Sequence, residues 1–165
     1  MLKLSTLIKN RLQNAKRIAL LAVGSELRAD DAAGLLAAGI LAADTRRKKR
    51  VKFKVFLGET APENLTGEIK KFAPSHLIII DSADSGRRPG QVSLINPQEA
   101  GGVSFSTHKV PLKIMADYLW ESCACSTLII GIKPKSLNFM GSICPEVKKA
   151  VTLVSRAIKE ALAGI

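Results

Sequence analysis

The chain has 165 residues, enough for one domain with a sizeable core and too few for two ordinary domains. Hydrophobic residues make up 47% of it and charged residues 24%, which excludes a disordered chain, and no apolar run approaches the ~20 residues of a membrane span. Lysine and arginine number 25 against 14 acidic residues, and the formal net charge of +11 raises the question of an anionic partner.

The first 17 residues are basic and amphipathic. Their leucines and isoleucine are interrupted by lysine and asparagine, so they lack the continuous apolar segment of a secretory signal. We predict a helix here, with Ser5 as its N-cap and with Leu7, Ile8 and Leu12 on one face.

Apolar runs alternate with helical patterns along the rest of the chain. The expected strands are 17–24, 51–59, 75–81, 90–96 and 126–134. The expected helices are 30–44, 62–74, 111–122 and 145–164. Unbroken apolar strands are usually covered by helices on both faces. The pattern predicts one α/β domain over residues 1–165, a three-layer α/β/α sandwich with a mostly parallel, mixed central sheet and an extra N-terminal helix (1–17).

Two adjacent carboxylates, Asp30 and Asp31, stand where the first of these strands gives way to a helix. A single carboxylate would suffice to cap that helix, whereas two adjacent ones repel each other, so a functional site competes with the capping interpretation. The loop lacks the glycine patterns of a phosphate site, and paired carboxylates would repel a phosphate. Sites in open parallel sheets lie at the carboxyl ends of strands, which is where this pair falls.

Two further residues share that expected location. Asp81 ends the apolar run 75–81, where a carboxylate either caps a neighbouring loop or belongs to a site. His108 lies in a loop, either as a surface residue or as a ligand, and together with Asp31 and Asp81 it would form a set that suits a divalent first-row metal. His76 falls at the opposite edge of the sheet and is interpreted as structural, and Asp84 is expected to be exposed.

A serine or cysteine nucleophile is a competing prediction. Ser25, Ser106 and Thr107 could each pair with His108, but the chain has no GxSxG elbow. The three cysteines are an odd number outside any recognisable nucleophile motif, which favours buried apolar packing and a reducing cytoplasm.

The densest basic cluster is TRRKKR, residues 45–50, with Arg46–Arg50 as its charged part. It is either a solvated connector or a binding patch. Aromatic residues make up only 4% of the chain and none interrupts the cluster, which argues against a nucleic-acid partner.

Several stretches in order resemble a known family: VGSELRADDAAG, GETAPEN, STHKVPL and GIKPKSLNF. The chain resembles the hydrogenase maturation endopeptidases, of the type that processes formate-hydrogenlyase (hydrogenase 3) enzymes, from about residue 18 into the last helix. The resemblance implies an endopeptidase that removes a C-terminal extension from a nickel–iron hydrogenase large-subunit precursor once nickel is inserted. The protein partner would be that precursor.

The resemblance also implies a site. The family's metal-binding acids and histidine correspond to Asp31, Asp81 and His108, both as catalytic and as metal-contacting residues. The metal would be nickel carried by the precursor, with no organic cofactor. Asp30 occupies the position of the acidic residue that usually precedes the family's first metal-binding acid. It would hold the loop or assist in protonation. Ser25 departs from the usual asparagine, and a serine can still bond the loop backbone.

Two other functions remain as alternatives. The basic charge would also suit a non-catalytic protein that holds an acidic partner or nucleic acid, with strongly salt-dependent affinity. A hydrolase of small substrates on a similar scaffold is disfavoured by the missing nucleophile elbow.

Overall fold

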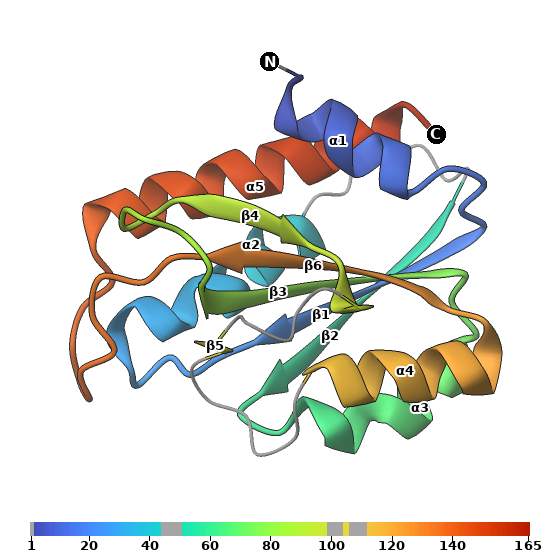
Figure 1. Ribbon diagram of the computed structural model, residues 1–165, viewed down its shortest axis with the longest axis horizontal. Coiled ribbons are helices and arrows are strands. Elements are labelled where there is room, and N and C mark those ends of the chain that lie inside the picture. Colours follow the sequence, from blue (N-terminus) through green and yellow to red (C-terminus); the bar gives the residue numbers. More distant parts are fainter. Residues whose placement is uncertain (1, 44–50, 99–103, 106–111) are drawn as a thin grey trace.

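A computed structural model describes residues 2–43, 51–98, 104–105 and 112–165. Figure 1 shows one twisted sheet between two layers of helices. The strands are β1 (Arg17–Val23), β2 (Lys52–Glu59), β3 (His76–Asp84), β4 (Val92–Ile95), β5 (Ser104–Phe105) and β6 (Ser126–Ile132). The helices are α1 (Leu4–Arg11), α2 (Ala33–Ala42), α3 (Thr66–Phe72), α4 (Leu112–Cys123) and α5 (Pro145–Ala163), with 3-10 turns η1 (Ala29–Ala32) and η2 (Pro62–Leu65).

The sheet has the order β2-β1-β3-β6-β4. Neighbours among β2, β1, β3 and β6 are parallel, whereas β4 runs antiparallel to β6. The short β5 adds an antiparallel pair at the far end of β3. The predicted mostly parallel, mixed sheet is therefore confirmed.

Helices cover both faces of the sheet, which explains the unbroken apolar strands. Alternate β1 residues such as Leu20 pack in one core with α1, α2 and α5. Their neighbours, such as Leu21, pack in a second core with α3 and α4. Each position of β1 from Ile18 to Val23 is thus buried against a helix layer on one side or the other. Within the described ranges, no helix combines the length and apolar character needed to cross a membrane.

The N-terminal helix differs in detail from the prediction. It spans only Leu4–Arg11, and Lys3 rather than Ser5 occupies its N-cap position. Ile8 and Leu12 are buried against α5, as their spacing predicts, but Leu7 is 38% exposed. The buried stripe on this short helix is therefore narrower than the sequence suggested.

Candidate active site at the carboxyl end of the sheet

The loop after β1 folds back on itself at Gly24. This glycine has a φ of +132°, and a Cβ there would lie 1.9 Å from the backbone oxygen of Asp31. Only glycine tolerates such a conformation together with such a close approach. In the same loop the backbone N–H of Leu27 donates to Ser25 Oγ at 3.3 Å. The expectation that serine would bond the loop backbone is confirmed.

Asp31 lies in the 3-10 turn η1, before α2, and is fully buried. The Ser82 hydroxyl donates to Asp31 Oδ1 at 2.6 Å. The structure therefore bonds Asp31 to the residue next to Asp81 and brings the two predicted carboxylates to one end of the sheet. Ser82 was not among the sequence-predicted residues, and its only sequence signal was its place directly after Asp81.

Asp81 is also fully buried, but the prediction that β3 ends there is wrong. The strand continues to Asp84, and Asp81 lies inside it in register with Gly131 of β6. The extension exists because Ala83 and Asp84 gain a partner strand, with Ala83 opposite Phe105 of β5. Asp84 is mostly exposed, as expected, and its carboxylate pairs with Lys133.

Asp30 has a different role from its neighbour. Its carboxylate accepts three backbone N–H groups from the β6–α5 connection: Lys135 at 2.8 Å and Ser136 at 3.0 Å on Oδ2, and Cys144 at 2.7 Å on Oδ1. Burial by itself would raise the pKa of Asp30, but the three N–H donors outweigh it and lower the pKa below the usual value. Asp30 thus holds a loop, one of the two roles considered for it, and the loop is the one before α5.

We expect Asp30→Asn to destabilise the protein by about 3 kcal/mol at neutral pH, because hydrogen bonds to a buried charge are strong and the amide NH₂ would face a donor. Urea unfolding followed by circular dichroism measures the change. Asp84→Asn, which removes an exposed carboxylate, is the matched control and should cost less than about 1 kcal/mol. Equal stability of the two variants would contradict the anchoring role of Asp30.

Cys125 and Cys144 do not fit the role of a nucleophile. All three cysteines are unpaired, and Cys125 is fully buried. Burial, with a contribution from nearby Cys123, raises the pKa of Cys125 to about 12, and burial also raises the pKa of Cys144. The thiolate is the reactive form, and a raised pKa disfavours it. Both thiols therefore fit a packing role.

The third member of the predicted trio, His108, lies outside the described residues, as do Ser106, Thr107 and the basic cluster 45–50. The described chain reaches Phe105, three residues before His108, beside β3. His76 opens β3 at the opposite end of the strand, as predicted, and burial lowers its pKa. No group of three or more His, Cys, Asp or Glu side chains suited to a metal occurs among the described residues.

Comparisons with known proteins agree with this fold. A family model described as "Hydrogenase maturation protease" matches residues 41–162. The hydrogenase 3 maturation protease of Escherichia coli strain K12 is 31% identical over 141 residues, covering 85% of this chain and 87% of that protein.

Solved structures give the same result. The NiFe hydrogenase maturation protease HycI from Thermococcus kodakarensis superposes with a TM-score of 0.83 at 26% identity, covering 94% of this chain and 98% of that one. The solution structure of the endopeptidase HycI from Escherichia coli gives a TM-score of 0.75 at 32% identity, covering 87% of this chain and 89% of that one. These relatives favour an enzyme over the alternative of a non-catalytic basic binding protein. The chain therefore belongs to the hydrogenase maturation proteases and is a peptide-bond hydrolase.

Proposed function

We propose that this protein removes the C-terminal extension of a nickel–iron hydrogenase large-subunit precursor after nickel has been inserted. The observation that carries the proposal is the pair of fully buried carboxylates, Asp31 and Asp81, at the carboxyl end of the parallel sheet. Ser82, the residue after Asp81, donates a hydrogen bond to Asp31. Such a position is where open α/β sheets place their sites. The relatives named for hydrogenase 3 and NiFe hydrogenase maturation support the choice of substrate.

In this proposal the metal belongs to the substrate. Asp31, Asp81 and His108 contact nickel already bound to the precursor and so distinguish loaded from unloaded precursor. Carboxylate and imidazole groups are suitable ligands for a divalent first-row metal. Nickel bound there would supply Lewis-acid chemistry at the scissile bond, or it would serve only for recognition while a carboxylate acts as general base. The protein uses no organic cofactor. The three unpaired thiols fit a reaction in the reducing cytoplasm.

The burial of the site adds a requirement. Asp31 and Asp81 are both 0% exposed, so a metal on another protein reaches them only when neighbouring segments move apart. Opening of the site therefore has to precede or accompany contact between the metal and these carboxylates.

The test is a cleavage assay on the cognate precursor in nickel-loaded and nickel-free forms, with the products identified by mass. We expect release of a C-terminal peptide from the loaded form alone. Equal cleavage of both forms would overturn nickel sensing and leave an ordinary processing protease. No cleavage of either form, with the precursor shown by an independent assay to mature, would overturn the proposed substrate.

A further inference from the structure

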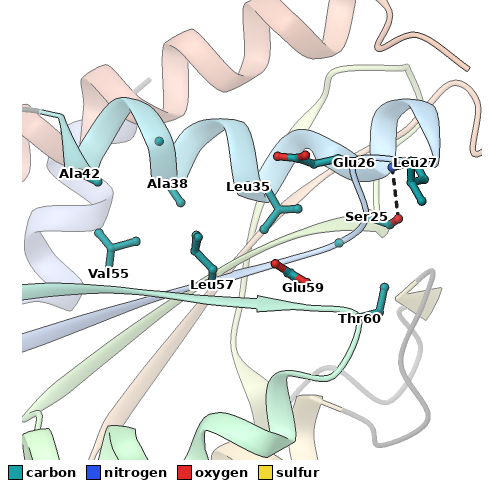
Figure 2. A pocket seen from close by; sticks show the side chains of 12 residues that line it. Ser25, Glu26, Leu27, Leu35, Ala38, Ala42, Val55, Leu57, Glu59 and Thr60 are labelled. Carbon is teal, nitrogen blue, oxygen red and sulfur yellow. Dashed lines mark hydrogen bonds between the residues drawn. The ribbon is translucent and has the colours of Figure 1, made fainter. Parts of the chain in front are cut away.

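A groove of about 760 Å³ runs between α2 and β2 and ends at the loop that leads to Asp31. Figure 2 shows its lining side chains. β2 is the outermost strand on this side of the sheet. The lining residues come from the loop after β1, from α2 and from the end of β2: Gly24, Ser25, Glu26, Leu27, Leu35, Ala38, Gly39, Ala42, Val55, Leu57, Glu59 and Thr60.

The groove exposes apolar side chains on both of its walls. Leu57 on β2 is 56% exposed and Leu27 on the loop is 54% exposed, with Leu35 buried between them. The apolar surface continues beyond Leu27, whose carbonyl accepts the N–H of Met140, a residue that is 72% exposed. A concave apolar surface of this kind on a folded protein is typical of a binding site.

One residue that lines the groove is a glycine that the packing of the described residues does not explain. Gly39 lies inside α2, where glycine weakens a helix relative to alanine. Apart from its neighbours and the backbone of its own helix, no described atom lies within 4 Å of the place its Cβ would take. Packing among the described residues therefore does not require glycine, whereas a ligand that approaches the helix backbone closely would.

The end of the groove nearest to Asp31 is acidic. Glu26 and Glu59 line it, and none of the described lining residues is basic, although the chain as a whole carries a charge of +11. Neither carboxylate forms an ion pair with a described residue. Figure 2 shows both side chains at this end of the groove, on either side of Leu35.

The backbone also holds Glu59 in an unusual conformation. Its φ is +50°, which non-glycine residues rarely adopt, and its carbonyl accepts the N–H of Gly24 at 2.9 Å. The register between β1 and β2 shifts at this point, so Glu59 lies opposite Val23. Strain that the surrounding structure maintains is concentrated at functional positions. Glu59 belongs to the GETAPEN stretch, which the Asp31–Asp81 site leaves without a role.

We propose that this groove binds a short extended segment of the protein substrate, with apolar side chains along α2 and β2 and a lysine or arginine side chain between Glu26 and Glu59. This inference rests on the proposed function in taking a protein as the substrate. From Leu35 to Ala42 the helix rises about 10 Å, the length of about three extended residues. Charge complementarity places the cationic residue of the segment nearest to the Asp31–Asp81 site.

The first experiment measures cleavage kinetics on the cognate precursor. Gly39→Leu fills the groove, and we expect KM to rise at least about tenfold with kcat within about twofold of wild type. Its melting temperature should equal or exceed that of wild type, because leucine is a better helix former than glycine. Gly67→Leu in α3 is the matched control, since a side chain there also meets no described atom within 4 Å and lies away from the groove.

The second experiment reverses the charge. Glu59→Lys should raise KM at least about tenfold, whereas Glu121→Lys on exposed α4 surface should not. Replacing each lysine or arginine of the precursor's C-terminal region by glutamate, one at a time, should give one substrate that wild type cleaves poorly and Glu59→Lys cleaves well. Kinetics unchanged in both groove variants, or no such rescue at any position, would overturn the inference.

A binding measurement separates failure of this inference from failure of the proposed function. Fluorescein-labelled overlapping peptides of the precursor's C-terminal region are titrated with wild type, Gly39→Leu and Glu59→Lys, and anisotropy is recorded. If wild type fails to cleave the precursor but a peptide binds and both variants weaken it at least about tenfold, the proposed substrate step fails and the groove stands. Equal peptide binding by all three proteins, or binding by none of them, would overturn the groove whatever the cleavage result.

Discussion

Asp31→Asn and Asp81→Asn are each expected to lower kcat/KM for cleavage of the nickel-loaded precursor by about a thousandfold. Asparagine keeps the shape of the side chain, and at position 31 its oxygen still accepts the Ser82 hydroxyl that Asp31 accepts at 2.6 Å. The loss should therefore reflect the missing charge and its contact with the metal of the substrate. His108→Ala should give a loss of similar size.

Asp84→Asn provides the control for this comparison. It removes a carboxylate from the same strand, three residues beyond Asp81, where the side chain is exposed and pairs with Lys133. The three variants and the control are compared by product mass over time, with circular dichroism to show that each is folded. Activity within about threefold of wild type in both Asp31→Asn and Asp81→Asn would show that the reaction does not use these carboxylates.

The second large effect concerns the backbone that shapes the site. Gly34→Ala should destabilise the protein by about 4 kcal/mol and lower the melting temperature by about 12 °C. A Cβ at Gly34 would lie 2.4 Å from the oxygen of Ile80 and 2.5 Å from that of Val23. Both are backbone atoms of neighbouring strands, so no side-chain rotation relieves the contact.

Two further variants make this prediction specific. Gly24→Ala should be at least as damaging, since its Cβ would lie 1.9 Å from the Asp31 oxygen and its φ is +132°. Gly39→Ala, five residues after Gly34 in the same helix, should instead stabilise the protein by about 1 kcal/mol, because nothing described lies near its Cβ. Thermal unfolding of the three variants measures the differences, and equal melting temperatures would show that the close contacts relax without cost.

The sequence predicted the layers of the fold because apolar residues are spaced differently in strands and in helices. Residues 18–23 are apolar at every position, which is typical of a strand covered on both faces, and β1 is covered in this way. The end of β3 was predicted less well. Its last two residues are held by β5, a pairing of two residues that leaves no periodic pattern in the sequence.

The site was predicted in part, for a similar reason. Asp31 and Asp81 follow from the rule that sites lie where parallel strands end, and both are at that end of the sheet. The neighbouring residues in the sequence could not show whether Asp30 and Asp31 cap the helix or form a functional pair. The partners of Asp30 lie 105 to 114 residues further along the chain, and no local pattern shows such distant contacts.

That long-range clamp has a consequence during biosynthesis. The turn that carries Asp31 is fixed by Asp30 to the amides of Lys135, Ser136 and Cys144, which leave the ribosome long after the turn itself. Domains fold cooperatively as units, and distant contacts form only after the intervening chain has closed its loop. We therefore expect Asp31 to become ordered, and activity to appear, only after a ribosome-bound chain has released Cys144.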